Sequence, residues 1–153
     1  MSDRVSTQVG DSFRRKHHES SQWWFRIVSV IYLFLGISWA PPIHANWMVG
    51  GMPGFDAPIG GVAYRGLLDY TFIFGLELLV MGAFLLYASR QPGHYLWFVW
   101  LIVALEIVRG ILGDVYMIVN GYETAFYIGF IILHLLIIGT GIAFVRQARG
   151  ETQ

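Results

Sequence analysis

The chain has 153 residues, of which 56% are hydrophobic and 13% are charged, and its formal net charge is zero. Soluble domains average roughly 25% charged residues, so this composition points away from a soluble protein and toward a single membrane domain. The balanced charge gives no indication of a nucleic-acid partner, and the absence of cysteine excludes disulfides, thiolate chemistry and cysteine-bound metals.

From the N-terminus onward, the sequence predicts a polar tail followed by four membrane spans. Residues 1–22 are polar and lack the apolar core of a signal peptide. Four apolar stretches then reach the roughly 17–25 residues that a helix needs to cross a bilayer. They cover about residues 23–39, 67–87, 95–119 and 125–145 of a membrane domain over 23–146, and a short tail follows at 147–153. Their side chains do not alternate as in barrel strands, so we expect an all-α integral membrane protein with a four-transmembrane-helix bundle.

Basic residues predict the orientation of these spans. Most Arg and Lys residues lie before the first span, between the second and third spans, or after the fourth. Arg65 is the only basic residue in the connections on the opposite side. The positive-inside rule therefore predicts that both termini are cytoplasmic and that the protein is a multi-pass protein of the inner (plasma) membrane.

The three connections differ in kind. "ASRQPGH" (88–94) and "NGYET" (120–124) contain residues that end helices and form tight turns. The connection between the first two spans is a long outer loop from Pro41 to about Gly66, rich in Gly and Pro yet apolar. Irregular backbone at membrane depth must be covered by protein or water. We expect this loop to fold over the outer end of the bundle as a lid or re-entrant cap, with an ordinary interfacial loop as the alternative.

Small residues predict where the helices pack. Lipid tails are as apolar as Leu, so membrane helices associate by close packing at small side chains. We therefore expect close helix contacts at seven glycines: Gly75, Gly82, Gly110, Gly113, Gly129, Gly139 and Gly141.

Ionisable residues interrupt the predicted spans at matching depths. At a rise of about 1.5 Å per residue, Glu77, Glu106 and His134 each lie about 14–16 Å from a span end, near the centre of a bilayer roughly 30 Å thick. Arg109 follows Glu106 by three residues on the same helix face, so it can pair with Glu106, with Glu77 on a neighbouring helix, or with both. The carboxylate left over is then protonated, shares a proton or binds His134.

These four residues have two interpretations. They form either a structural cluster that fixes helix register, or the polar floor of a small-molecule site or proton relay. A second group lies toward the outer mouth, either as an entrance ring or as solvated helix ends: Asp69, Tyr70, Asp114 and Tyr116.

Cofactor chemistry has little support in the sequence. It contains no P-loop, dinucleotide fingerprint, zinc motif or nucleophilic triad. One His with two carboxylates could hold iron, manganese or zinc, but no Glu-x-x-His pair occurs and Arg109 disfavours a cation. We expect no metal and no cofactor.

Three motifs resemble those of a known family. They are "WWFR" (23–26), "WAPPI" (39–43) and "EIVRGILGDVYMIVNGY" (106–122). Together they resemble the BphX-like family of small bacterial membrane proteins over about residues 22–146. The resemblance implies an inner-membrane protein associated with aromatic or hydrocarbon degradation pathways, and it carries over no catalytic residue.

The sequence therefore favours a non-catalytic accessory or binding protein for a small apolar molecule. One alternative is a membrane enzyme that uses Glu77 and Glu106 for proton transfer on a lipid-soluble substrate. Another is a structural subunit of a larger membrane complex. The expected partners are the lipid bilayer, a small apolar ligand, and either another membrane protein or a second copy of this chain; no nucleic acid is expected.

Overall fold

A computed structural model describes residues 22–150, and every regular element in that range is helical, as the sequence predicted. A helix over Gln22–Ser38 comes first. It is followed by α2 (Pro41–Gly51), α3 (Val62–Ala88), the 3-10 helix η1 (Pro92–Tyr95), α4 (Leu96–Leu105), the π-helix η2 (Glu106–Ile111), α5 (Leu112–Val119) and α6 (Thr124–Gly150). The predicted tail over 1–22 lies outside the described residues except for Gln22, and α6 extends through residues 147–150 of the predicted C-terminal tail.

Three of the described helical runs are long and apolar enough to cross a membrane. They are Val62–Ala88, the continuous run Pro92–Val119, and Thr124–Ala148. The helix Gln22–Ser38 is also apolar but falls short of that length. Two prolines follow it and occupy the first positions of α2, where the missing backbone N–H of proline removes no helical hydrogen bond.

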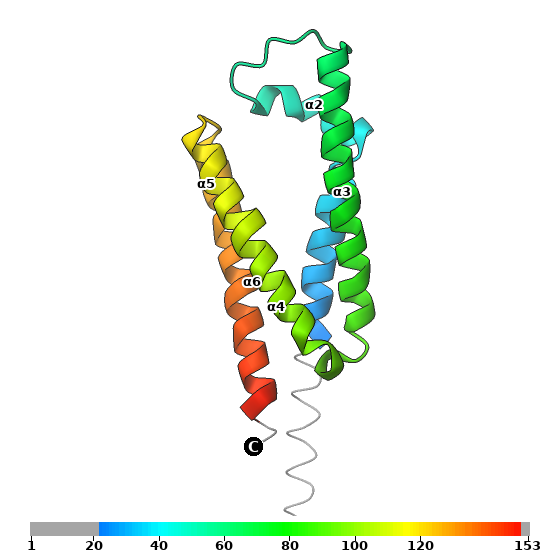
Figure 1. Cartoon of the computed structure of the whole chain (residues 1–153), viewed down its shortest axis with the longest axis vertical. Helices are drawn as coiled ribbons and strands as arrows, with labels where there is room; N and C mark the ends of the chain where they lie inside the picture. The colour runs from blue at the N-terminus through cyan, green and yellow to red at the C-terminus, as the bar shows by residue number, and fades with distance from the viewer. Residues whose placement is uncertain (1–21, 151–153) are drawn as a thin grey trace, which may run out of the picture.

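The helices form two pairs that meet at one end and diverge at the other (Figure 1). The first pair consists of the helix Gln22–Ser38 and α3. The second pair consists of the run α4–η2–α5 and α6, which contact each other along their length.

The hydrophobic core lies at the closed end and joins the two pairs. Phe25 from the first helix and Val99 from α4 are fully buried there, and Val145 from α6 is 1% exposed. Trp24 packs in the same cluster and its indole N–H donates to Thr140 Oγ1 on α6 at 3.1 Å. The closed end is therefore held by close packing and by one hydrogen bond between the pairs.

Glycines hold the first helix directly against α3. A Cβ added to Gly75 would lie 2.7 Å from the Cβ of Trp39, and a Cβ added to Gly36 would lie 2.9 Å from the carbonyl oxygen of Gly75. Ser29 adds a buried hydrogen bond from its hydroxyl to the Gly82 carbonyl oxygen at 2.8 Å. Such close backbone approach is the usual role of small residues in membrane helices.

The predicted glycine contacts are correct at four positions and wrong at three. Gly75, Gly82, Gly110 and Gly141 each lie against a neighbouring helix. Gly113, Gly129 and Gly139 have nothing within 4 Å of an added Cβ. Their helix faces point away from the neighbouring helices, which residue type alone does not indicate.

The outer connection is more ordered than its composition predicted. Its first half forms α2, which lies across the open end of the molecule near the start of α3 (Figure 1). Tyr64 on α3 donates to the Ala45 carbonyl oxygen of α2 at 3.3 Å. His44 is 1% exposed and its ring centroid lies 4.4 Å from that of Trp39, and this burial lowers the pKa of His44. The irregular part of the connection is thus limited to residues 52–61.

Candidate functional site

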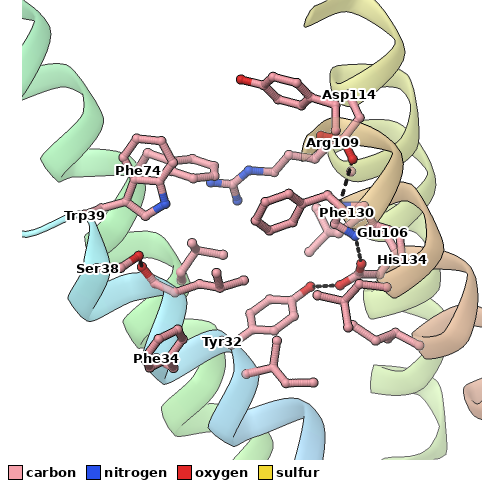
Figure 2. A pocket seen from close by; sticks show the side chains of 18 of the residues that line it. Tyr32, Phe34, Ser38, Trp39, Phe74, Glu106, Arg109, Asp114, Phe130 and His134 are labelled. Carbon is pink, nitrogen blue, oxygen red and sulfur yellow. Dashed lines mark hydrogen bonds and ion pairs between the residues drawn. The ribbon is translucent and has the colours of Figure 1, made fainter. Parts of the chain in front are cut away.

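A cavity of about 560 Å³ lies between the two helix pairs. This volume is within the range of about 300–1,000 Å³ that is usual for small-molecule sites. Most of its wall is aromatic or aliphatic (Figure 2). Aromatic side chains come from both pairs: Tyr32, Phe34, Trp39, Phe74, Phe126, Tyr127 and Phe130. The polar part of the wall consists of Ser38, Glu106, Arg109, Asp114 and His134.

The π-helix η2 carries two of these polar residues. It occupies Glu106–Ile111, between α4 and α5, in the middle of the apolar run Pro92–Val119. A π-turn is wider than an α-turn, so it changes the direction in which successive side chains point. Single π-turns inside α-helices occur frequently at functional sites. Here the π-turn separates the directions of Glu106 and Arg109, which an α-helix would place one above the other.

Glu106 is the centre of a hydrogen-bond network (Figure 2). It is 3% exposed, and each of its carboxylate oxygens has a partner. The Tyr32 hydroxyl donates to Oε1 from the opposite helix pair, and His134 Nδ1 bonds to Oε2. On the other side of the ring, His134 Nε2 lies 3.3 Å from Asp114 Oδ2. A buried carboxylate needs such partners because its desolvation is costly.

Gly110 allows His134 to reach Glu106. A Cβ at Gly110 would lie 2.6 Å from His134 Nδ1 and 2.7 Å from two ring carbons. The imidazole therefore packs directly on the backbone of η2. Any larger residue at this position would push the ring away from the carboxylate.

Arg109 crosses the cavity to the first helix pair. Its Nη2 lies 2.9 Å from Glu77 Oε2 on α3. Its guanidinium carbon lies 4.0 Å from the ring centroid of Phe74, which is a cation–π contact. The pair is partly open, with 31% of the Arg109 side chain and 61% of the Glu77 side chain exposed.

These contacts select one of the predicted pairings. Arg109 pairs with Glu77 and not with Glu106, and Glu106 is the carboxylate left over that binds His134. Glu106 instead binds Tyr32 and His134. The prediction assumed regular α-helical spacing, which the π-turn at these residues does not follow.

The predicted outer-mouth group does not form a ring. Asp69 is exposed, and Tyr70 and Tyr116 are 80% and 65% exposed. None of the three lines the cavity. Asp114 instead joins His134 inside the site. Its position four residues after Gly110 places it on the cavity side of the helix, a periodicity that could have been read from the sequence.

Sequence reasoning missed the aromatic half of the site. Tyr32 and Trp39 are seven residues apart on the first helix and its end, and both line the cavity. On α6, Phe126 and Phe130 precede His134 at intervals of four residues. These spacings place each set on one helix face. Only the tertiary contacts distinguish that face from a lipid-facing stripe.

A metal site is not evident in the described part of the chain. Within residues 22–150, no group of three or more His, Cys, Asp or Glu residues is arranged to hold a metal ion. His134 bonds to Glu106 through Nδ1 and lies at ion-pair distance from Asp114 through Nε2, so both of its ring nitrogens face carboxylates.

The described residues therefore define an all-helical protein with three helical runs able to cross a membrane and a polar network beside an aromatic-lined cavity. The chain belongs to the BphX-like family, whose sequence profile matches residues 19–150. It is similar to the uncharacterised BphX-like proteins of Burkholderia cepacia and of Paraburkholderia xenovorans strain LB400. Each is 31% identical over 121 residues, which cover 77% of this chain and 86% of the relative. No solved structure matches the chain.

Proposed function

We propose that this protein crosses the bacterial inner membrane four times, with both termini in the cytoplasm, and binds a small apolar molecule between its two helix pairs. The cavity of about 560 Å³ with its aromatic wall is the observation that carries the binding proposal. An aromatic or hydrocarbon ligand suits this wall, in keeping with the degradation pathways that the family resemblance implied.

The exposed apolar surface supports the membrane proposal. Within the most apolar windows of the three long runs, only 28%, 33% and 22% of residues are buried inside the protein. The remaining apolar surface requires an apolar solvent. The helix Gln22–Ser38 lies beside α3 and would extend about 25 Å. This length is close to the roughly 30 Å of a bilayer core, so it supports a fourth span.

The internal contacts of Glu106 and His134 favour binding over catalysis. Both oxygens of Glu106 and Nδ1 of His134 are hydrogen-bonded within the protein, and His134 Nε2 lies 3.3 Å from Asp114 Oδ2. A general base needs a free lone pair within hydrogen-bonding distance of its substrate. Glu77 is held by Arg109, so the two carboxylates of the enzymatic alternative lie apart and each has a partner.

A second candidate function is proton transfer along the network. The observation that favours it is the unbroken chain of contacts from Tyr32 through Glu106 and His134 to Asp114. Chains of ionisable side chains inside membrane helices are typical of proton pathways. In that case replacing His134 would abolish proton uptake, whereas blocking the apolar part of the cavity would not.

Carbene labelling with phenyl(trifluoromethyl)diazirine tests the binding proposal. On exposed apolar surfaces the amount of label rises linearly with the concentration of this neutral aromatic compound. At a binding site the amount of label reaches a plateau. We expect saturable labelling of cavity residues such as Phe130, detected by mass spectrometry of the protein in lipid nanodiscs. Leu133→Trp fills the cavity from α6 and should abolish it.

Leu135→Trp is the matched control because Leu135 lies two residues away on the same helix and is 53% exposed outside the cavity. It should leave the saturable labelling intact. Labelling that increases linearly with concentration everywhere, in the unmodified protein as in both variants, would contradict the binding proposal.

A further inference from the structure

The ionisable groups around the cavity carry an excess of negative charge. Among the described residues, three carboxylates belong to the cluster, on Glu77, Glu106 and Asp114, against two bases, Arg109 and His134. Glu77 and Arg109 neutralise each other. Even with a doubly protonated imidazole, the group of Glu106, His134 and Asp114 retains one net negative charge.

The contacts of His134 set the number of protons in this group of three residues. Its Nδ1 is hydrogen-bonded to Glu106, and its Nε2 lies at ion-pair distance from Asp114 Oδ2, so each ring nitrogen faces a carboxylate and each contact is favourable with one proton between its partners. Two protons satisfy both contacts and leave one negative charge. The other titratable groups that line the cavity nearby are the phenols of Tyr32 and Tyr127, which are neutral donors and do not compensate it. Compensation requires either a third proton or a cation.

The rest of the cavity is suited to a cation. Aromatic faces attract positive charge through their quadrupole. Arg109 already makes such a contact with Phe74 at 4.0 Å. Phe130 and Trp39 also line the cavity, and the ring centroid of Phe130 lies 6.4 Å from that of His134. An apolar cation could therefore contact aromatic rings while its charge lies beside the carboxylates.

We propose that the ligand of this cavity is a lipophilic monocation, an apolar molecule with a single amine, quaternary ammonium or phosphonium centre, which binds beside Glu106 and Asp114 in place of a third proton. This inference rests on the proposed binding function and specifies the chemical class of its ligand. Because ligand and proton compensate the same charge, each excludes the other.

A pair of ions with one shape and opposite charge provides the test. Tetraphenylphosphonium and tetraphenylborate differ mainly in sign, and neither titrates, so any pH dependence comes from the protein. Binding to the purified full chain is measured by equilibrium dialysis in detergent. We expect tetraphenylphosphonium to bind at least about tenfold more tightly, because the carboxylates attract its positive charge and repel the negative charge of tetraphenylborate.

The pH dependence follows from the competition with a proton. In a series of measurements from about pH 8 to about pH 5, protons compete increasingly with the ligand for this charge, so the affinity for tetraphenylphosphonium should fall, by at most about tenfold per pH unit. This measurement uses the unmodified chain, so it does not depend on whether a variant folds. A constant affinity across that range would overturn the inference.

Carboxyl-to-amide variants locate the charge. Asp114→Asn and Glu106→Gln should each weaken tetraphenylphosphonium binding by about tenfold or more and remove its pH dependence. Asp69→Asn is the matched control, because Asp69 is exposed on α3 and does not line the cavity. It should change neither property. Thermal unfolding of each variant verifies that it is folded.

The outcomes separate this inference from the function on which it rests. Equal binding of the two ions, or preference for tetraphenylborate, would overturn the monocation inference. Saturable labelling by the neutral diazirine would then still support an apolar site. If neither ion binds and no saturable labelling occurs, both proposals fail.

Discussion

Arg109 binds Glu77, whose Oε2 lies 2.9 Å from Arg109 Nη2 on the opposite helix pair, and not Glu106 three residues before it in the sequence. At the cavity, this ion pair and the hydrogen bond from Tyr32 to Glu106 both connect the two helix pairs. The charged residues within the apolar run 92–119 therefore connect the two helix pairs where these pairs diverge.

The first prediction concerns the partner of Arg109. Arg109→Ala leaves Glu77 uncompensated and should lower the free energy of unfolding by roughly 1–3 kcal/mol, between the values for exposed and fully buried pairs. Adding Glu77→Gln should recover much of this loss because it removes the unpaired charge. Thermal unfolding in detergent measures both effects.

Glu106→Gln combined with Arg109→Ala is the control for that experiment. Glu106 has its own partners, so this double variant should be less stable than Arg109→Ala alone. If Glu106→Gln restored the stability lost in Arg109→Ala and Glu77→Gln did not, the ion pair would be the one between Glu106 and Arg109 on η2.

The second prediction concerns the glycine under His134. Gly110→Ala places a methyl group within 3 Å of the imidazole, and such overpacking typically costs about 1–3 kcal/mol. Gly113→Ala is the matched control because nothing lies within 4 Å of its added Cβ. It should be neutral, or stabilising by up to about 1 kcal/mol through helix propensity. Equal effects of the two substitutions on the unfolding temperature would contradict the packing of His134 on Gly110.

The third prediction concerns orientation. The four proposed spans, with basic residues on one side, require a cytoplasmic C-terminus. A C-terminal fusion to green fluorescent protein should therefore fluoresce in bacterial cells, and a fusion to alkaline phosphatase at the same position should be inactive. The opposite pattern would rule out the proposed orientation, and it would also follow if the helix Gln22–Ser38 did not cross the membrane.

The fourth prediction concerns the outer connection. Residues 52–61 are irregular, while α2 is anchored through His44 and the hydrogen bond from Tyr64 to Ala45. Limited proteolysis from the outer side should therefore cut within 52–61 and spare Pro41–Gly51. Mass spectrometry of the fragments identifies the sites. Early cuts within α2 would mean that this helix does not stay docked on α3.

The sequence alone determined that the described chain is helical and approximately where its helices end. Long apolar stretches have to satisfy their backbone hydrogen bonds internally, which favours helices whatever the side chains contact. Residues that end helices act locally: Pro41 and Pro42 follow the end of the first helix, and Gly121 adopts a positive φ of 85° in the turn before α6. These features depend on neighbouring residues only, so composition and spacing were sufficient to predict them.

Only the tertiary structure decided which charges pair and which aromatic residues line the cavity. Spacing suggested a contact between Glu106 and Arg109, but it could not reveal the π-turn that points them in different directions. Nor could it show that Tyr32, more than seventy residues before Glu106 in the chain, would donate to that carboxylate. A buried charge takes the partner that compensates it best in three dimensions. That choice depends on how closely the helices approach, as at Gly110 and His134, and not on the order of residues within one helix.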